Sequence, residues 1–482
     1  MRPAADLDLP VLLDRRSGTP LQQQLAAALR DAALAGLIPA GGRLPPTRLL
    51  AAQLHLARST VLTAYQQLDS EGYLDSRHGS GTYLTAHLHP APPVGEASSA
   101  HSQAEPGRPG PAGGDVIDMR PGQPDTRRLA DPAWRAAWRA AVSDPPPATE
   151  PAVQGLPRLR AEIAAHLAVA RGLPADPANI FITAGTRDGL SLLVHALHLY
   201  GRPVAVEDPG YPDARRLLNR LGCAPLPVPV DGEGLVVDAL PQGQRVPPLV
   251  LVTPSHQYPL GGRLPLLRRL TLLDWATQYG ATIAEDDYDS EFRFDVAPLP
   301  ALASLDQNAR VVHLGTFGKV LTPWLRIGYL VAPNRLVPDL LTIRDDLGTP
   351  VSGIDQQALA TYLRTGALRR HVARARRDYR HNRAHLTRLL AHHTPEICIR
   401  GLDAGLHAVL ELPHNVDAEF VVQHAHSRGV LVDNLDDYAV TTPRLGPPAL
   451  VLGYGGATLE HLDRAVTAIR EALATAIPVG SA

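Results

Sequence analysis

The chain has 482 residues, 45 % of them hydrophobic and 20 % charged, which suits a soluble globular protein of two or three domains. Its formal net charge of −2 excludes a basic footprint over the whole chain, so any contact with nucleic acid has to come from a local patch. The two cysteines, the lack of a long apolar run and the acidic N-terminus exclude a disulfide framework, a membrane span and a signal peptide, and they predict a cytoplasmic protein.

Residues 1–84 are predicted to form three helices and a hairpin, because apolar residues recur at helical spacing between Gly and Pro breaks. The three helices are expected at Pro20–Ala35, Thr47–Leu54 and Ser59–Ser70. Two short strands follow, Tyr73–Ser76 and Thr82–Leu84, with Gly79 and Gly81 in the turn. This order predicts a winged helix-turn-helix whose third helix enters the major groove of DNA.

The N-terminal end of that third helix carries Arg58, Ser59 and Thr60. Arginine can donate two hydrogen bonds to a guanine edge, and hydroxyls suit phosphate contacts. Arg48 in the second helix and Arg77–His78 in the wing add positive charge. The alternative is that these are ordinary polar residues on the surface of a small helical bundle.

The run RLPPTRLLAAQLHLARSTVLTAYQQLDSEGYLDSRHGSGTYL resembles the GntR-type winged helix-turn-helix over its whole length. The resemblance implies contacts with double-stranded operator DNA from Arg48, Arg58, Ser59, Thr60, His78 and Gly79. Ala57 departs from the family, which commonly has a serine or threonine there.

A linker is predicted at residues 85–114, after the DNA-binding domain at 1–84. Nineteen of the 25 residues from 90 to 114 are Pro, Gly, Ser or Ala, and Val94 is their only larger aliphatic side chain. Such a segment cannot bury enough apolar surface to order itself.

Residues 115–482 alternate short apolar runs with helical patterns, which predicts an α/β domain with a largely parallel sheet and a smaller C-terminal subdomain from about residue 350. The expected strands are Ile180–Thr183, Pro203–Val206, Leu249–Val252, Ala281–Ala284, Val311–Leu314 and Gly328–Val331. The expected helices between them include Thr186–Leu199 and Leu267–Tyr279.

Lys319 is the only lysine among the 46 basic residues. A codon bias toward arginine explains most of this skew, but arginine cannot replace lysine in Schiff-base chemistry because its guanidinium stays protonated. Thr316 and Arg326 lie close to Lys319 in sequence and offer a hydroxyl and a phosphate-binding fork. An amine, a hydroxyl and a guanidinium together suit pyridoxal phosphate.

Pyridoxal phosphate also requires a carboxylate at its pyridine nitrogen, for which Asp286 is the candidate, with Tyr288 two residues later. The turn Gly185-Thr186-Arg187 between a strand and a helix is a candidate phosphate site, and Tyr211 is a candidate ring for stacking. The alternative is an acidic loop or a cation site at Glu285–Asp289, but the usual metal-loop spacing is absent, so no metal is expected.

Residues 115–476 resemble a fold-type I aminotransferase, and the fusion resembles the MocR/GabR-type regulators. The motifs that carry this resemblance occur in the expected order: GLPRLRAEIAAHLAVARG, ITAGTRDGL, VEDPGYP, TPSHQYPLGG, EDDYDSEFR and TFGKVLTPWLRIGY. The resemblance implies that Lys319 forms the Schiff base, Asp286 faces the pyridine nitrogen, and Tyr288 donates to the phenolic oxygen. The resemblance also implies that Tyr211 stacks on the pyridoxal-phosphate ring and that Tyr258 lies beside that ring. The implied phosphate ligands are Gly185, Thr186, Thr316 and Arg326, with Arg187 in the same turn.

Four positions depart from aminotransferases, and the first is Tyr258, which stands where free aminotransferases usually have an asparagine. Val451 stands where an arginine usually clamps the substrate carboxylate, and Asp213 stands where some sensors of carboxylated amines have an arginine. Gly318 replaces a serine often found before the lysine. Arg400 or Arg444 can substitute for the clamp only if the fold brings them near. Turnover of ordinary amino acids is therefore not expected.

The sequence thus predicts a homodimeric, pyridoxal-phosphate-dependent transcription regulator. The predicted signal is either an amine or amino-acid effector or pyridoxal phosphate itself, and the regulated genes belong to vitamin B6 or amino-acid and amine metabolism. One alternative is an active aminotransferase that also binds DNA. Another is a cofactor-free dimerisation scaffold, which the joint presence of Lys319, Asp286 and Arg326 disfavours.

Overall fold

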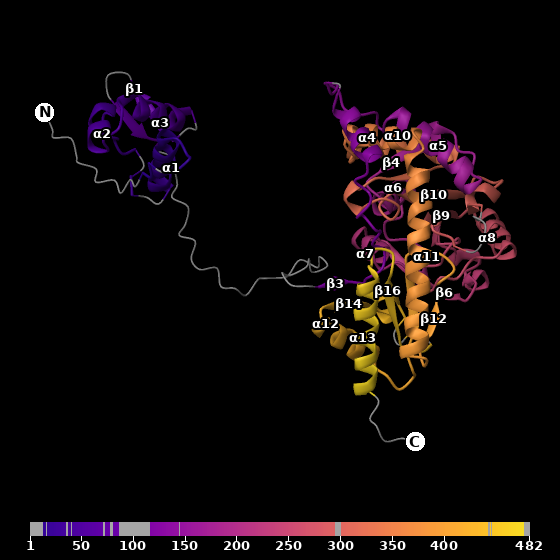
Figure 1. Ribbon diagram of the computed structural model, residues 1–482. Helices are drawn as coiled ribbons and strands as arrows, with labels where there is room; N and C mark the ends of the chain where they lie inside the picture. Colours follow the sequence, from indigo (N-terminus) through magenta and orange to yellow (C-terminus); the bar gives the residue numbers. More distant parts are fainter. Residues whose placement is uncertain are drawn as a thin grey trace. The chain divides into compact units, whose positions relative to one another are not determined.

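The computed structural model divides into two compact units, Met1–Gly110 and Pro111–Ala482 (Figure 1). It describes residues 13–15, 17–34, 37–39, 41–70, 73–77, 81–85, 116–143, 145–294, 300–441, 444 and 446–476. The expected linker therefore lies outside the described residues, apart from Thr85. Each unit is considered by itself.

The smaller unit contains the three predicted helices and the hairpin. They are α1 (Leu21–Leu34), α2 (Thr47–Gln53), α3 (Arg58–Ser70), β1 (Leu74–Arg77) and β2 (Gly81–Leu84). The antiparallel hairpin pairs Leu74 with Leu84 and Arg77 with Gly81, so Gly81 belongs to the second strand and not to the turn as predicted. The winged helix-turn-helix fold is thereby confirmed.

Apolar faces of all five elements form the core of this unit. Leu25 and Leu29 of α1 pack with Val61 and Leu68 of α3, and the hairpin adds Leu74 and Leu84. The Tyr65 hydroxyl donates a hydrogen bond of 2.9 Å to the Pro45 carbonyl, which ties α3 to the start of α2. The relative position of the two helices is therefore fixed by buried contacts.

The larger unit is built on an eight-stranded sheet with the order β4-β11-β10-β9-β8-β5-β6-β7. Its strands are β4 (Ile180–Thr183), β5 (Pro203–Asp208), β6 (Ala224–Asp231), β7 (Gly234–Leu235), β8 (Leu249–Val252), β9 (Thr282–Asp287), β10 (Val311–Thr316) and β11 (Gly328–Val331). Only β11 and β7 run antiparallel to their neighbours, so the predicted largely parallel sheet is confirmed.

Every predicted strand of this sheet is present, and three run past their predicted ends. The apolar runs at Ile180–Thr183 and Leu249–Val252 are buried along their whole length, as expected for strands covered on both faces. β5 extends to Asp208, β9 to Asp287 and β10 to Thr316. These extensions carry polar residues, so hydrophobic periodicity alone ended the strands too early.

Helices cover the sheet and continue into the C-terminal part (Figure 1). They are α4 (Pro132–Ser143), α5 (Pro157–Arg171), α6 (Thr186–Ala196), α7 (Pro212–Arg220), α8 (Leu266–Tyr279), α9 (Val337–Leu347), α10 (Gly353–Arg364), α11 (Ala367–His393), α12 (Ala418–Ser427) and α13 (Leu459–Ala476). α6 ends three residues before its predicted end, ahead of His198, whose φ of 49° is left-handed.

The C-terminal part has its own antiparallel sheet of four strands, in the order β12-β13-β16-β15. These strands are β12 (Cys398–Arg400), β13 (His407–Glu411), β15 (Asp433–Asn434) and β16 (Ala449–Gly453), and a separate pair joins β14 (Val430–Leu431) to β3 (Ile117–Asp118). One apolar core runs from Leu159 of α5 to Leu462 of α13, so this part packs continuously with the large sheet.

Candidate functional site

The predicted site residues gather at one edge of the eight-stranded sheet. Thr183 at the end of β4 and Thr316 at the end of β10 both pair with Gly328, the first residue of the antiparallel strand between them. A β-carbon on Gly328 would stand 2.8 Å from the Gly185 Cα, so the turn before α6 lies against the start of β11. The carboxyl ends of parallel strands are where α/β sheets place their ligands.

Thr186 and Asp286 meet at this edge, although 100 residues separate them. The Thr186 hydroxyl lies 3.4 Å from a carboxylate oxygen of Asp286, which is only 5 % exposed at the end of β9. The pKa of Asp286 is raised to about 7, mainly by burial and also by the neighbouring Asp287, while Thr186 and Lys319 act in the opposite direction. A buried carboxylate of this kind is stabilised by a cationic partner in the same cleft.

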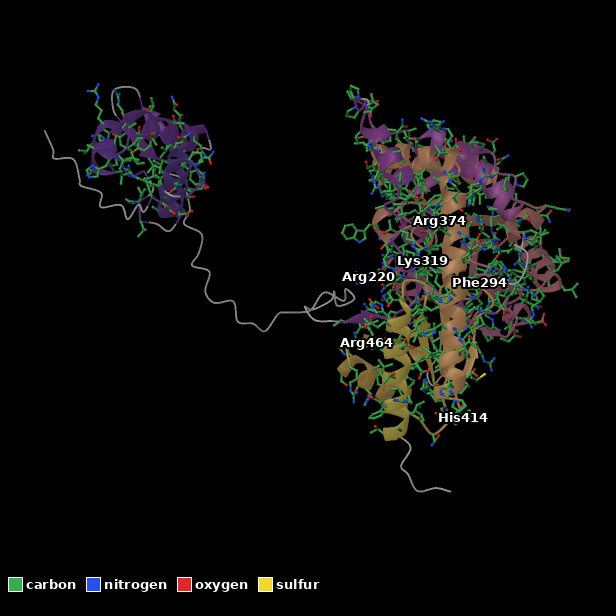
Figure 2. All side chains as sticks on the ribbon, in the orientation of Figure 1. Arg220, Phe294, Lys319, Arg374, His414 and Arg464 are labelled. Atoms are coloured by element: carbon green, nitrogen blue, oxygen red, sulfur yellow. The ribbon has the colours of Figure 1, made fainter. Side chains whose placement is uncertain are left out.

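Lys319 follows β10 and lies within the large unit (Figure 2). Its Nζ donates a hydrogen bond of 2.9 Å to the carbonyl oxygen of Gly122. A β-carbon on Gly122 would stand 2.1 Å from that Nζ, and the φ of this glycine is +89°. Residue 122 therefore has to be glycine for the amine to occupy this position.

Three tyrosines form a chain of edge-to-face contacts beside the site. The Tyr258 ring lies 6.0 Å from Tyr211 and 5.4 Å from Tyr288, measured between ring centroids. Burial raises the pKa of Tyr211 and of Tyr288 above the usual range, so both side chains remain neutral phenols. The Tyr211 loop is held in place because the Gly210 amide donates to the Tyr438 carbonyl at 3.0 Å.

Behind Tyr288 stands a buried pair, His256 and Asp289. The His256 Nδ1 lies 2.9 Å from an Asp289 carboxylate oxygen and 2.9 Å from the Tyr288 hydroxyl oxygen. A carboxylate only accepts, so the proton of this pair sits on Nδ1, which can donate to both oxygens. The Tyr288 hydroxyl is then free to donate its own proton elsewhere, which is the role that the family resemblance implies.

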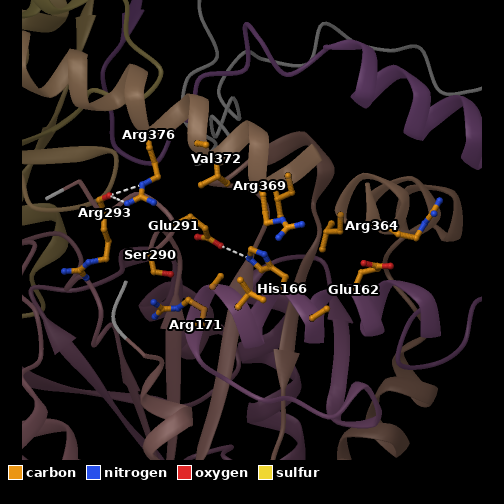
Figure 3. A pocket seen from close by; sticks show the side chains of 16 residues that line it. Glu162, His166, Arg171, Ser290, Glu291, Arg293, Arg364, Arg369, Val372 and Arg376 are labelled. Carbon is orange, nitrogen blue, oxygen red and sulfur yellow. Dashed lines mark hydrogen bonds and ion pairs between the residues drawn. The ribbon is translucent and has the colours of Figure 1, made fainter. Parts of the chain in front are cut away.

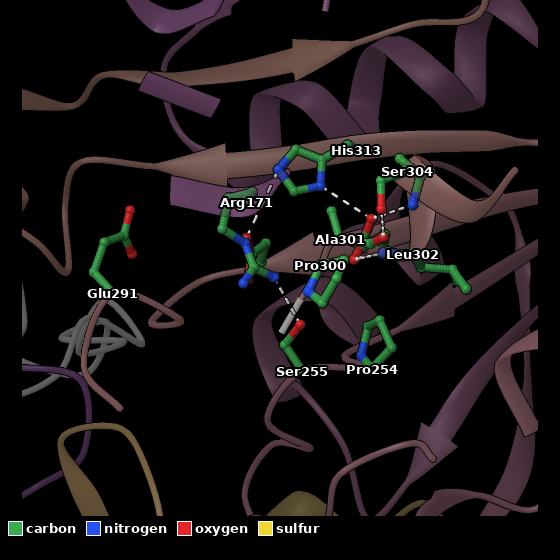
Figure 4. A network of polar contacts seen from close by, with 12 residues as sticks. Arg171, Pro254, Ser255, Glu291, Pro300, Ala301, Leu302, Ser304 and His313 are labelled. Atoms are coloured by element: carbon green, nitrogen blue, oxygen red, sulfur yellow. Dashed lines mark hydrogen bonds and ion pairs between the residues drawn. The ribbon is translucent and has the colours of Figure 1, made fainter. Parts of the chain in front are cut away.

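The remaining acids of β9 belong to a separate buried network with Arg171 and His313 (Figure 4). Glu285 lies 3.0 Å from His313 and Asp287 lies 2.6 Å from Arg171, with all four side chains buried. Burial alone raises the pKa of Glu285, but His313 and Arg171 hold it below its usual range. Because alternate residues of a strand face opposite sides, the acidic run is divided between two environments. The described residues contain no cluster of acids, histidines or cysteines arranged to hold a metal.

Two arginines of the predicted site are not joined to Asp286 by the described contacts. Arg187 is exposed and lies 3.6 Å from Asp213. Arg326 is exposed and has a left-handed φ of 51° just after the turn Pro323–Leu325. The Thr316 hydroxyl accepts a hydrogen bond of 3.1 Å from the Gly318 amide, which fixes the backbone before Lys319.

Val451 is fully buried in β16 and faces an apolar cluster with Val409, Leu435 and Tyr438. Tyr258 packs against the same cluster, so Val451 lies in an apolar wall. Of the two suggested substitutes, Arg400 pairs with Glu411 and Arg444 pairs with Asp436 at 3.0 Å. Both charges are therefore engaged with acids of the same chain.

In the smaller unit, the candidate DNA contacts lie at the helix-turn-helix. Arg48 on α2 and Arg58 and Ser59 at the start of α3 are exposed, and Thr60 is half-buried. His78 and Gly79 lie outside the described residues. Gly81 in the wing has a φ of +112°, which a larger residue adopts only with strain, and a β-carbon there would also displace the Arg43 side chain.

Sequence reasoning assigned no role to Gly122 or His256, and it considered Asp289 only as part of a rejected cation site. Gly122 lies 197 residues before Lys319 in an irregular segment, so no local pattern links the two. His256 and Asp289 lie within the TPSHQYPLGG and EDDYDSEFR motifs, which is a usable signal, but only the fold shows that they contact each other.

The two units define the class of protein: a helix-turn-helix DNA-binding domain fused to an aminotransferase-fold domain. The profile described as "Bacterial regulatory proteins, gntR family" matches residues 21–84. The pyridoxine biosynthesis transcriptional regulator PdxR of Corynebacterium glutamicum is 42 % identical over 466 residues, 97 % of this chain and 99 % of the relative. The probable rhizopine catabolism regulatory protein MocR of Rhizobium meliloti is 32 % identical over 96 % of this chain and 95 % of its own length.

Solved structures of aminotransferases resemble the larger unit. An archaeal alanine:glyoxylate aminotransferase has a TM-score of 0.69 and 26 % identity, covering 74 % of this chain and 91 % of that protein. The α-aminoadipate aminotransferase LysN of Thermus thermophilus, complexed with N-(5'-phosphopyridoxyl)-L-leucine, has a TM-score of 0.66 and 26 % identity, covering 75 % and 92 % of the two chains. The chain belongs to the MocR-type regulators of the GntR family, and it is a transcription regulator with an aminotransferase-like domain. Among the described residues, no helix is both long and apolar enough to cross a membrane.

Proposed function

We propose that the larger unit binds pyridoxal phosphate on Lys319 and that this binding controls operator recognition by residues 1–84. The observation that carries this proposal is the pairing of Thr186 with the buried Asp286 at the sheet edge that also receives the chain's single lysine. The donor set fits the cofactor, since it combines an amine, a buried carboxylate, phenols and the N-terminal end of α6. Residues 85–114 act as the linker to the effector domain at 115–482.

When bound, pyridoxal phosphate supplies an aldehyde that condenses with a primary amine and a ring that withdraws electrons. Asp286 would hold the ring nitrogen, Tyr211 would stack on the ring, and the Tyr288 hydroxyl would donate a hydrogen bond to the phenolic oxygen. The phosphate is bound by the turn at Gly185, Thr186 and Arg187 together with Thr316 and Arg326. The first amides of α6 have no carbonyl partner within the helix, so they are available to an anion.

We further propose that the signal is pyridoxal phosphate itself and that the controlled genes serve vitamin B6 synthesis. The relative that is 42 % identical along nearly the whole chain is named as a regulator of pyridoxine biosynthesis. The buried Val451 supports this choice over an amino-acid effector, because an apolar wall offers a carboxylate no charge-assisted partner. The same wall favours a regulator over an active aminotransferase. A ligand shifts the protein between states only by its difference in affinity for them.

A homodimer in the cytoplasm completes the proposal. Trp324, five residues after Lys319, is 93 % exposed, and exposed aromatic side chains of this size are typical of interface residues. Cys223 and Cys398 are free thiols, which suits a reducing compartment.

The experiment is fluorescence anisotropy on DNA upstream of vitamin B6 synthesis genes, with cofactor-free full-length protein and added pyridoxal phosphate. We expect the cofactor to change the DNA affinity about fivefold or more, in line with usual coupling energies. Lys319→Arg keeps the charge but cannot condense with an aldehyde, so its DNA affinity should not respond. An equal response of both proteins would contradict the proposal.

A further inference from the structure

A cavity lies on the large unit, between α5, the end of α10, the N-terminal half of α11 and the loop that follows β9 (Figure 3). Its volume is about 410 Å³, within the range of small-molecule sites. Its lining is strongly basic, with Arg171, Arg293, Arg364, Arg369, Arg376 and His166. None of the residues assigned above to pyridoxal phosphate lines it, so it is a separate site.

The positive charge of this cavity exceeds its negative charge. Five arginines line it against two acids, Glu162 and Glu291, and Glu291 is engaged with His166 at 3.4 Å. Arg171 has an acidic partner, Asp287, at 2.6 Å. In the described part of the chain, no ion pair joins Arg293, Arg369 or Arg376 to a carboxylate. The cavity therefore holds uncompensated cations.

Among the arginines that line the cavity, Arg293 is the least exposed to solvent, at 2 %. Its Nη1 donates to the Ser255 carbonyl at 3.0 Å, and its backbone carbonyl accepts from Arg376 Nε at 3.0 Å. Burial and the nearby Arg263 and Arg171 lower the pKa of Arg293, and Asp289 offsets this only in part, so repulsion dominates around its charge. An anion in the cavity relieves that repulsion.

Two buried polar atoms of the lining have no hydrogen-bond partner among the described residues: Ser290 Oγ and Arg293 Nε. Ser290 is 4 % exposed, so water does not replace the missing partner freely. Buried donors without partners are rare in folded proteins and point to a group that the site binds. A hydroxyl and a guanidinium are both donors from which oxyanions accept hydrogen bonds.

The rest of the lining is apolar. Val169 of α5, which is 76 % exposed, faces the cavity together with Leu368 and Val372 of α11. In Figure 3 the Arg369 side chain extends from α11 toward His166, across from the Ser290 end of the cavity. A ligand that uses the whole cavity has an apolar part as well as a negative charge.

We propose that this cavity binds a small organic anion, a carboxylate or a phosphate, that lies between Ser290 and Arg293 on one side and Arg369 on the other, with its apolar part along Val169 and Val372. This site does not depend on pyridoxal phosphate at Lys319. The cavity is nevertheless connected to the proposed pyridoxal-phosphate site by β9. Arg171 of the cavity lining pairs with Asp287, which is the next residue after Asp286 in that strand.

The test is isothermal titration of the full-length protein with succinate and, separately, with inorganic phosphate. The two probes distinguish a carboxylate ligand from a phosphate ligand. Arg369→Gln removes an exposed lining charge and should weaken the preferred anion about tenfold, a loss of about 1.4 kcal/mol. Arg370→Gln is the matched control, because Arg370 is the next residue of α11, is also exposed and does not line the cavity.

Ser290→Ala separates a binding role from a structural one. Its hydroxyl has no partner in the empty cavity, so its removal should weaken anion binding while the free energy of unfolding stays unchanged. The proposal is overturned if wild type binds neither anion, or if Arg369→Gln and Arg370→Gln bind them as wild type does.

Discussion

The Lys319 amine donates a hydrogen bond of 2.9 Å to the Gly122 carbonyl, and Nζ occupies the space that a β-carbon on residue 122 would need. A segment at the start of the large unit thus positions the only amine side chain of the protein. This contact crosses 197 residues of sequence, so it exists only in the folded unit.

Gly122→Ala should displace Lys319, because a β-carbon would stand 2.1 Å from Nζ. We expect less pyridoxal phosphate trapped on Lys319 by borohydride, measured by mass spectrometry. Gly201→Ala is the control, since Gly201 also has a positive φ, +70°, but has open space around its β-carbon position. Equal trapping in both variants would show that the Gly122 contact does not position the amine.

Asp286→Asn should change how the stability of the cofactor-free protein depends on pH. Burial raises the pKa of Asp286 to about 7, so the folded protein prefers the protonated form, whereas the unfolded chain titrates near about 4. The contribution of Asp286 to the free energy of unfolding is therefore present at low pH and is lost as the pH rises from about 4 to about 7. Asparagine stays neutral at every pH, so the variant does not lose stability at this position as the pH rises.

The measurement is urea unfolding of wild type and Asp286→Asn at about pH 4.5 and about pH 8. We expect the variant to gain stability relative to wild type at the higher pH. Glu207, whose pKa burial also raises to about 7, is present in both proteins and largely cancels in the comparison. A difference that is independent of pH would contradict the assigned burial of the Asp286 charge.

His256→Phe should destabilise the fold, because it leaves Asp289, 1 % exposed, as a buried carboxylate without its partner. Removing one member of a buried pair typically costs about 3 kcal/mol. Urea unfolding measures the loss, and His381→Phe on the exposed side of α11 is the control. If both variants unfold alike, the His256–Asp289 contact contributes nothing to stability.

Arg58→Ala should reduce specific DNA affinity by ~1–3 kcal/mol if the arginine makes a two-bond contact with a base. Arg58 is exposed at the start of α3, where a recognition helix meets base edges. Gln66→Ala alters an exposed residue later in the same helix and should bind normally. Normal operator binding by Arg58→Ala would show that another element reads the DNA.

Much of the fold follows from sequence patterns. The apolar runs at Ile180–Thr183 and Leu249–Val252 predict β4 and β8 to the residue, since fully buried strands have no polar positions that confuse the pattern. The ends of β9 and β10 were predicted too short because Glu285–Asp287 and Gly315–Thr316 are not apolar. Those residues belong to the strands because the backbone pairing continues through them.

The site was predicted less completely than the fold. Motifs assign candidate roles to Lys319, Asp286 and Tyr288, because chemistry requires those residue types. The contacts of Gly122 and His256 depend on which loops the fold brings together, and no spacing in the sequence encodes them. The cavity at Arg293 and Arg369 was missed for the same reason, since its arginines come from separate elements of an arginine-rich chain.

The most direct test of cofactor binding is borohydride reduction of the protein after incubation with pyridoxal phosphate, followed by peptide mapping. Lys319 and the N-terminal amine are the only primary amines of the chain, so the map has two possible sites. We predict one cofactor adduct per chain, on the peptide that contains Lys319, and none in Lys319→Arg. A protein that carries no adduct on Lys319 would contradict the proposal that this regulator binds pyridoxal phosphate.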